Sequence, residues 1–237
     1  MNRYDEIILL RQELKRPGVF RHHNIQLRMV MWHLTIRCSV FFKRLMDIIL
    51  SILALVIGSP IFLAAAILVK ITSPGPIIFS QVRVGKFGRH FKFYKFRSMY
   101  IDAEARKAEL MKHNESGDGV IFKMKRDPRI TPVGRFIRKF SIDELPQLFN
   151  VLLGDMSLVG PRPPLPSEVR TYTLEERKRL NITPGITCLW QVSGRSELPF
   201  SKQIALDKEY IASQGVWNDF LILLKTVPAI LTGKGAW

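Results

Sequence analysis

An uncharged run of 22 residues, Ile48–Val69, constrains the fold of this 237-residue chain more than any other feature. As a straight helix the run would extend about 33 Å, which is enough to cross a hydrocarbon core of about 30 Å. A long segment with many charges precedes the run, which argues against a cleavable signal peptide. The run therefore predicts a membrane segment, and a buried helix of a soluble domain is the less favoured alternative.

The middle of this run contains Ser59-Pro60. Proline lacks the N–H that would donate to the carbonyl of Val56, so the helical ladder is interrupted there. The Ser59 hydroxyl can satisfy part of the loss by donating to a carbonyl one turn back. The sequence therefore predicts a kink at membrane depth.

Both flanks of the run are basic, and positive residues favour the cytoplasmic side of a membrane. A spanning helix would have to translocate one basic flank, whereas a re-entrant hairpin keeps both flanks inside. In a hairpin, Asp47 and Lys70 could lie at the same interface. A kinked spanning helix remains the alternative. The basic residues are Arg3, Arg11, Lys15, Arg16, Arg21, Arg28, Arg37, Lys43 and Arg44 before the run, and Lys70, Arg83, Lys86 and Arg89 after it.

The composition adds a strong positive charge, because 36 Lys and Arg residues face 20 Asp and Glu residues, a formal net charge of +16. Such a balance predicts a polyanionic partner, which would be nucleic acid, an anionic membrane surface or a phosphorylated substrate. The two cysteines, Cys38 and Cys188, are far apart in sequence and have apolar neighbours. We interpret them as reduced structural residues.

We divide the chain into an amphipathic N-terminal extension (1–44), a membrane helix (45–70) and a larger unit (71–237). Apolar patches between basic residues in the extension are typical of a helix that lies in the membrane interface. In the larger unit, the hydrophobic periodicity and turn residues predict a mostly helical α+β fold with a small hairpin and strand element. The expected strands are Ile77–Val84, Phe91–Tyr94 and Ile186–Val192. The expected helices are Ala103–Lys112, one from Pro132, one from near Asp143 to Gly154, one from Thr173 to Leu180, Phe200–Ala212 and Trp217–Leu231.

Two adjacent acids, Asp143 and Glu144, stand among basic residues in the segment Ser141–Pro163. Ser141-x-x-Glu144 has the spacing of a capping box, whereas Asp143 as N-cap would place Pro146 in the first helical turn. Either arrangement puts both acids at a helix N-terminus, where phosphate also binds well. The local sequence leaves a structural cap and a site for phosphates and a divalent metal as alternatives.

Basic residues approach the acids from both sides along the chain. Prolines on both sides of Arg162 restrict its backbone, so a stiff loop would present its guanidinium. Simple solvation of the other basic residues, and a linker with an incidental arginine, are the alternatives. The basic residues are Arg135, Arg138 and Lys139 before the acids and Arg162 after them.

Several short motifs follow one another in a fixed order from Lys43 to the C-terminus. In this order they resemble the bacterial sugar transferases, which are monotopic phosphoglycosyl transferases; residues 1–42 fall outside the resemblance. The motifs are Lys43-Arg44 with Asp47, Ser59-Pro60, Tyr94-Lys95-Phe96-Arg97-Ser98-Met99, Asp143-Glu144-Leu145-Pro146-Gln147, Gly160-Pro161-Arg162-Pro163, and Pro184-Gly185-Ile186-Thr187 with Gln191-Val192-Ser193-Gly194-Arg195.

The resemblance implies transfer of a sugar-1-phosphate from a UDP-sugar to a polyprenyl phosphate, commonly undecaprenyl phosphate, with release of UMP. This reaction would initiate synthesis of a surface glycan such as an exopolysaccharide, a capsule or the O-antigen of lipopolysaccharide. The resemblance also implies Mg²⁺ as cofactor and a place at the cytoplasmic face of the bacterial inner membrane, in contact with its lipid. The expected fold is then a monotopic membrane protein with a re-entrant helix broken at Ser59-Pro60.

By similarity, Asp143 is the nucleophile that forms an aspartyl phosphosugar, and Glu144 holds Mg²⁺ or orients Asp143. Both acids are therefore candidate metal ligands, because oxygen ligands suit this hard ion. The other expected substrate-binding residues are Lys95, Arg97 and Arg138 as phosphate contacts, and Pro161, Arg162, Pro163, Gln191 and Arg195 for the nucleotide or the acceptor.

A non-catalytic, basic, membrane-anchored module that binds anionic lipid is the rival hypothesis. It would explain the net charge and the apolar run, but it would give Asp143 and Glu144 no task beyond capping. No interleaved aromatic RNA-binding motif or recognition helix supports nucleic acid as a partner. The sequence names neither the sugar nor the oligomeric state, so a homodimer stays open.

Overall fold

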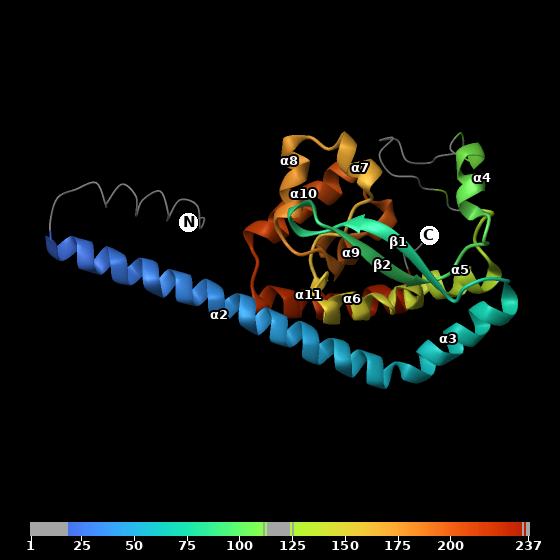
Figure 1. Ribbon diagram of the computed structural model, residues 1–237, viewed down its shortest axis with the longest axis horizontal. Helices are drawn as coiled ribbons and strands as arrows, with labels where there is room; N and C mark the ends of the chain where they lie inside the picture. The colour runs from blue at the N-terminus through green and yellow to red at the C-terminus, as the bar shows by residue number, and fades with distance from the viewer. Residues whose placement is uncertain (1–18, 111, 113–123, 125, 234, 236–237) are drawn as a thin grey trace.

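The computed structural model describes residues 19–110, 112, 124, 126–233 and 235. In Figure 1, the long helix α2 and the shorter α3 run along one side of the molecule, and the other elements gather on the other side. The fold is α+β and mostly helical, as the sequence predicts. Its helices are α2 (Val19–Ile57), α3 (Ser59–Thr72), α4 (Ala103–Leu110), α5 (Pro132–Lys139), α6 (Gln147–Leu153), α7 (Pro166–Thr171), α8 (Leu174–Arg177), α9 (Leu189–Ser193), α10 (Phe200–Ala212) and α11 (Val216–Thr232). Its strands are β1 (Ile78–Val84), β2 (His90–Phe96), β3 (Ser157–Val159) and β4 (Gly185–Thr187).

The apolar run is divided between α2 and α3, which meet at Gly58 with a bend of 63°. Pro60 lies in the first turn of α3, and the Ser59 hydroxyl donates to the Val56 carbonyl at 2.8 Å. The predicted kink and its serine bond are both confirmed. Among the described residues, no single helix is long and apolar enough to cross a membrane, whereas the bent pair meets that test together.

Helix α2 passes through the expected boundary between residues 44 and 45 without a break. Residues 1–18 of the expected extension lie outside the described residues.

The predicted hairpin forms from β1 and β2, which pair antiparallel from Ile78 opposite Phe96 to Val84 opposite His90. A second, parallel pair joins β3 to β4. The strand expected over Ile186–Val192 is wrong beyond Thr187, because Leu189–Ser193 forms the short helix α9. A short apolar run cannot be assigned to strand or helix by periodicity alone, and here packing of the buried Trp190 favours the helical turn.

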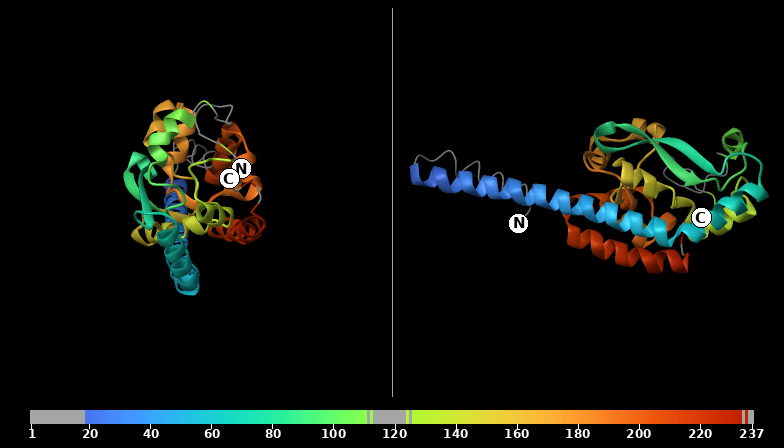
Figure 2. Two further views of the ribbon diagram at one scale, coloured as in Figure 1. Left: turned by 90° about the vertical axis from the view of Figure 1, so that its right-hand side faces the viewer. Right: turned by 60° about the horizontal axis from the view of Figure 1, so that its bottom comes forward.

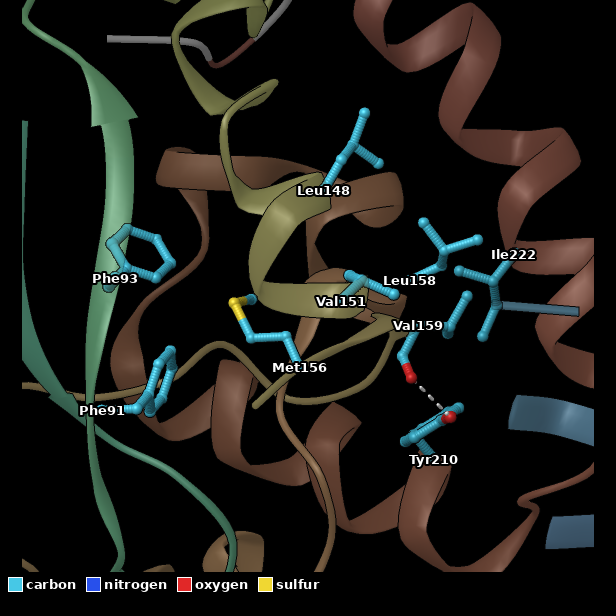
Figure 3. Close-up of a cluster of buried hydrophobic side chains, with 9 residues drawn as sticks. All are labelled: Phe91, Phe93, Leu148, Val151, Met156, Leu158, Val159, Tyr210 and Ile222. Carbon is cyan, nitrogen blue, oxygen red and sulfur yellow. Dashed lines mark hydrogen bonds between the residues drawn. The ribbon is translucent and has the colours of Figure 1, made fainter. Parts of the chain in front are cut away.

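The main core lies between the hairpin, α6, β3 and the two C-terminal helices (Figure 3). The Tyr210 hydroxyl from α10 donates to the Val159 carbonyl at 3.0 Å, which ties α10 to β3. Leu50 and Leu55 of α2 pack against this cluster, so this part of α2 belongs to the core of the domain. The buried members of the cluster are Phe91, Phe93, Leu148, Val151, Met156, Leu158, Val159, Tyr210 and Ile222.

The polar residues that precede the apolar run fasten α2 to the domain. Lys43 donates to the Val159 carbonyl at 3.0 Å and pairs with Asp219 of α11 at 2.5 Å. Arg44 donates to the Leu152 carbonyl at 2.9 Å, at the C-terminal end of α6. Asp47, which is 2 % exposed, accepts the Leu158 N–H at 3.0 Å.

Asp47 and Lys70, which a hairpin could place at the same interface, are not joined by any contact among the described residues. Asp47 faces β3, and the Lys70 side chain is exposed at the far end of α3.

Helix α11 lies beside α2 (Figure 2), with one face in the core and another exposed. Ile222 is 1 % exposed in the core, whereas Trp217 is 71 % and Leu231 is 70 % exposed. Its outward face is therefore apolar and uncovered in the chain as described.

Predicted helix boundaries with an identifiable cap are confirmed. The Thr131 hydroxyl accepts the Gly134 N–H, Thr173 and Glu176 form the predicted capping box, and Gly154 ends α6 with φ of 90°. The apolar residues of α5 are only partly covered, because Ile137 is buried but Phe136 is 55 % exposed.

Candidate functional site

The two acids lie on a 3-10 turn, η3 (Ile142–Glu144), between α5 and α6. Ser141 precedes the turn with φ of 54° and makes no capping bond with its side chain. Helix α6 begins only at Gln147, with Pro146 at its N-cap. Both capping interpretations of the sequence are therefore wrong, because the chain turns once before the helix starts and neither acid caps it.

Helix α6 is fixed to strand β2 by one side chain, that of the fully buried Asn150. Its Oδ1 accepts the Tyr94 N–H at 3.1 Å, and its Nδ2 donates to the Lys92 carbonyl at 2.7 Å. An asparagine that satisfies both a donor and an acceptor of the backbone sets the register between the two elements. This register places Lys95, the next residue of β2, beside the acids.

Lys95 bridges the two acids. Its Nζ lies 2.7 Å from Glu144 Oε1 and 3.6 Å from Asp143 Oδ2. Asp143 is only 5 % exposed, and the side chain of Glu144 is 17 % exposed. Two carboxylates that share one cation in a buried place are expensive to maintain for stability alone, because each ion loses its hydration.

The surroundings shift the pKa values of the two acids in opposite directions. Burial raises the pKa of Asp143, and the charge of Glu144 adds to this rise against the opposing charge of Lys95. Burial also acts to raise the pKa of Glu144, but the charges of Lys95 and Arg162 outweigh it, so this pKa lies below its ordinary value. Glu144 is thus the firmly ionised member of the pair.

Three of the predicted arginines gather around the acids. The charge of Arg138 acts on Asp143, whereas Arg162 and Arg195 act on Glu144. Arg195 Nη2 also lies 3.5 Å from the Ser141 hydroxyl, and its Nη1 is buried without a hydrogen-bond partner. With Lys95, these side chains form an excess of positive charge that suits a diphosphate.

Backbone strain marks the same place. Ser141 and Arg195 have φ of 54° and 51°, in the left-handed region that costs a side-chain-bearing residue about 1 kcal/mol or more. The two strained residues contact each other across the site. Strain at two touching positions is typical of a functional site, where the surrounding structure imposes it.

Two predicted contacts lie elsewhere. Arg97 is 6 % exposed and donates to the carbonyls of Pro74 and Ser73 at 2.7 and 2.6 Å, so it ties β2 to the loop after α3. Its expected phosphate contact is therefore corrected to a structural role. Gln191 accepts the Cys188 thiol at 3.1 Å within α9, and no described contact joins it to the acids.

The predicted prolines act through the backbone of the loop that carries Arg162, residues 160–164. Pro161 and Pro163 are buried, and their carbonyls accept bonds from Gly185 N and from Arg83 Nη1. The loop crosses β4 closely, because a Cβ added to Gly185 would lie 2.0 Å from Gly160 N. The prolines therefore shape the loop around Arg162.

Sequence reasoning missed Arg83 and treated it only as part of a basic flank. Arg83 is 8 % exposed, lies over the Phe93 ring at 5.2 Å and is affected by the charges of Arg162 and Glu144. Strand alternation gives no signal for it, since its neighbour Val84 is buried too.

The pair of acids fits a divalent cation, although the described residues contain no group of three or more His, Cys, Asp or Glu side chains that could hold one. Two adjacent carboxylates offer hard oxygen ligands, and Mg²⁺ is often held by one or two carboxylates with substrate phosphates and water completing the shell. The Lys95 ammonium lying against both acids shows that this place favours a cation.

A model of the family described as "Bacterial sugar transferase" matches residues 38–233. This chain belongs to the bacterial sugar transferase family. The match covers α3, the hairpin, both acids, the Arg162 loop and the whole of α11.

Individual members of the family are also similar to the chain. A "Galactosyl transferase CpsE" of Streptococcus agalactiae is 50 % identical over 82 % of this chain and 43 % of its own length. An "Undecaprenyl-phosphate galactose phosphotransferase" of Salmonella typhimurium is 43 % identical over 91 % of this chain and 46 % of its own length. The chain thus spans less than half of these two relatives.

A third relative is covered more fully. The "Exopolysaccharide production protein ExoY" of Sinorhizobium fredii is 38 % identical over 82 % of this chain and 88 % of its own length.

Proposed function

We propose that this protein is a phosphoglycosyl transferase that moves a sugar-1-phosphate from a UDP-sugar to a polyprenyl phosphate such as undecaprenyl phosphate, and so initiates synthesis of a surface glycan. The observation that carries the proposal is the buried pair of acids joined by Lys95, with distances of 3.6 Å to Asp143 and 2.7 Å to Glu144. Relatives named as undecaprenyl-phosphate galactose and N-acetylgalactosamine phosphotransferases support this reaction class.

In this mechanism Asp143 is the nucleophile. One of its carboxylate oxygens attacks the phosphorus next to the sugar, the bond from that phosphorus to the bridging diphosphate oxygen breaks, and UMP leaves. A phosphate oxygen of the polyprenyl acceptor then attacks the same phosphorus, and the bond to Asp143 breaks to restore the carboxylate. Lys95 and Arg138 would stabilise the charge that develops during both transfers.

Glu144 has a separate task in the proposal. Its lowered pKa keeps it ionised, so with Asp143 it would hold Mg²⁺ against the donor diphosphate. The bound ion would neutralise phosphate charge and so make the phosphorus a better electrophile.

The exposed apolar surface of three helices supports a membrane location. Ile57, Ile71 and Trp217 are each more than 70 % exposed, and they lie on α2, α3 and α11. We propose that α2 and α3 enter the cytoplasmic face of the inner membrane as a re-entrant pair, so that the site meets the lipid-borne acceptor. The bend of 63° and the basic flanks support this arrangement.

The rival hypothesis of a lipid-binding adaptor no longer explains the two acids. It assigned them only to helix capping, and neither acid caps α6. Two buried carboxylates with strained neighbours would then have no role that offsets their cost.

The proposal is tested by measuring UMP release from a panel of UDP-sugars with Mg²⁺ in detergent or lipid nanodiscs. We expect release with at least one donor, and loss of at least a thousandfold in Asp143→Asn, since this change removes the nucleophile. Asp155→Asn, a matched change at a half-buried aspartate just after α6, serves as the control and should retain activity.

Intact-protein mass spectrometry after incubation with donor alone tests the covalent step. The expected mass gain is that of one phosphosugar, and it should be absent from Asp143→Asn. Undiminished UMP release in that variant would exclude Asp143 as nucleophile.

A further inference from the structure

We propose that two buried arginines, Arg83 and Arg179, are positioning residues that aim Arg162 at the donor diphosphate. This inference rests on the proposed function, because it assumes that Arg162 contacts the diphosphate of the UDP-sugar. Neither arginine belongs to the sequence motifs that suggested the family, and both act through the backbone of the loop 160–164.

The loop is held by its carbonyl groups, one after another. Three of its five residues are prolines and have no N–H to donate, so carbonyl bonds are the main way to fix it. Four successive carbonyls are each occupied. Pro161 O accepts Gly185 N at 2.9 Å, Arg162 O accepts Arg179 Nη2 at 3.3 Å, Pro163 O accepts Arg83 Nη1 at 3.1 Å, and Pro164 O accepts Val84 N at 2.9 Å.

The bonds to the carbonyls of Arg162 and Pro163 are the two that come from side chains. A guanidinium has its donors in a rigid planar fork, so it fixes direction as well as distance. Arg83 uses its second amino group on Gln81 Oε1 at 3.0 Å, and its plane lies over the ring of Phe93. Arg83 therefore links the hairpin to the carbonyl that follows Arg162.

Arg179, which donates to the carbonyl of Arg162 itself, lies in the 3-10 turn η4 (Lys178–Asn181) and links the loop to α10. It pairs with Asp207 at 2.6 Å and donates to the Tyr172 hydroxyl at 3.1 Å, with only 6 % of its own surface exposed. The Arg162 backbone is thus fixed between the hairpin and α10, two elements that the loop does not join in sequence.

The energetics of Arg83 point to function. Among the described residues no carboxylate lies within ion-pair distance of it, although it is buried. Burial and the charge of Arg162 lower its pKa to about 10. A cation that is buried beside another cation destabilises a fold, so its retention at this place is explained by the geometry that it imposes on Arg162.

Positioning matters because Arg162 already acts on the acids. Its charge contributes to the low pKa of Glu144, so its guanidinium lies within electrostatic reach of the dyad. An arginine binds a diphosphate best through two parallel hydrogen bonds, which tolerate little displacement. Loosening either carbonyl anchor should weaken donor binding even with Arg162 intact.

A double-mutant cycle on binding of UDP with Mg²⁺, measured by isothermal titration calorimetry, separates positioning from general damage. We expect Arg162→Ala to weaken binding about 10- to 100-fold, the loss typical of a charge-assisted contact. Arg83→Lys, which keeps the charge but not the fork, should weaken it about three- to tenfold. In the Arg162→Ala background, Arg83→Lys should change affinity less than about twofold.

The control is Arg89→Lys, the same change at an exposed residue beyond the turn of the hairpin, which should bind UDP as the wild type does. If the effects of Arg83→Lys and Arg162→Ala are additive, Arg83 acts independently of Arg162 and the inference is overturned. An Arg162→Ala variant with unchanged affinity overturns it as well.

Two further outcomes distinguish this inference from the proposed function. If UDP does not bind the wild type at all, the proposed function fails together with the inference. If UMP release depends on Asp143 but Arg83→Lys binds UDP normally, only the inference fails. Should Arg83→Lys not fold, Pro163→Ala loosens the same anchor and is expected to show the same non-additivity with Arg162→Ala.

Discussion

Two neighbouring carboxylates with opposite pKa shifts are the central feature at the scale of single residues. Burial and the charge of Glu144 raise the pKa of Asp143, whereas the surrounding cations lower the pKa of Glu144. Environments that push two acids apart commonly assign them different tasks. Here they favour Glu144 as the permanent anion that attracts a metal, and Asp143 as the group whose charge is stabilised only when cations and substrate assemble.

This asymmetry predicts that Asp143→Asn stabilises the fold at neutral pH. The folded-state pKa of Asp143 lies above its unfolded value near 3.8, so the folded state binds the proton more tightly. The free energy of unfolding therefore falls as the pH rises from 3.8 through the folded pKa, and asparagine avoids this loss. We expect Tm to rise by about 2–4 °C at pH 7.5, which is on the order of 1 kcal/mol.

The measurement is thermal unfolding with EDTA present, so that no divalent ion stabilises the carboxylate. The gain in Tm should shrink as the pH is lowered toward 4, because the wild-type acid then becomes neutral too. Asp155→Asn, the matched change at a half-buried position just after α6, should leave Tm within about 1 °C. A gain that stays constant across this pH range would contradict the electrostatic origin.

The residues that sequence could and could not assign differ in what holds them. Lys95, Arg138, Arg162 and Arg195 were predicted from charge and motif order, and the charge of each acts on at least one of the two acids. Arg97 carries the same charge in the same motif as Lys95, yet its guanidinium is occupied by backbone carbonyls. Spacing along a chain does not say which cation finds a substrate and which one finds a carbonyl group.

At the scale of elements, α2 is both the long N-terminal helix and a part of the domain. Lys43 crosses from α2 to Asp219 of α11, which is fully buried, and the same carboxylate accepts the Tyr210 hydroxyl at 2.7 Å. These buried contacts fix the angle at which the apolar run leaves the domain. They therefore couple the placement of the domain's elements to that of the apolar run.

Breaking the ion pair between Lys43 and Asp219 should destabilise the protein strongly. Asp219→Leu leaves the Lys43 ammonium without its buried partner, a change that costs about 3 kcal/mol and should lower Tm by roughly 6–12 °C. Adding Lys43→Met to Asp219→Leu should restore most of the loss, because two apolar side chains then replace the ion pair. The readout is thermal unfolding in detergent.

The matched comparison is the exposed ion pair between Lys208 and Glu175. Its removal by Lys208→Met should lower Tm far less than Asp219→Leu does, since solvent screens exposed pairs. A double variant at 43 and 219 that is no more stable than Asp219→Leu would show that the aspartate acts through Tyr210 instead.

Elements with strong local signals were predictable from the sequence, and elements set by tertiary contacts were not. The hairpin, the Thr131 and Thr173 caps and the Gly154 terminus depend on residues close together in the chain. The 3-10 turn that carries the acids depends on Ser141 adopting a left-handed conformation, supported by Arg195 more than fifty residues later. No local pattern encodes that contact.

At the scale of the whole molecule, the apolar helices gather along one side, and the turn that carries the acids, η3, contacts both α3 and β2. In Figures 1 and 2, α2, α3 and α11 run along one side, and the hairpin with the elements around it lies on the other. Exposed apolar side chains on all three helices, such as Val56, Ile71 and Leu224, give that side a surface fit for lipid. A re-entrant pair would bring this side to the membrane without translocating either basic flank.

The chain carries its own probe for this topology, because Cys38 is exposed on α2 before the apolar run, whereas Cys188 is buried. In a re-entrant arrangement, a membrane-impermeant maleimide should label Cys38 in inverted vesicles and not in intact bacterial spheroplasts. A Cys38→Ser/Lys70→Cys variant moves the probe to the exposed end of α3 and should give the same result. A spanning helix would place the two probes on opposite sides, so labelling of either one in intact spheroplasts would exclude the re-entrant pair. Permeabilised spheroplasts, in which both sites should react, provide the control for accessibility.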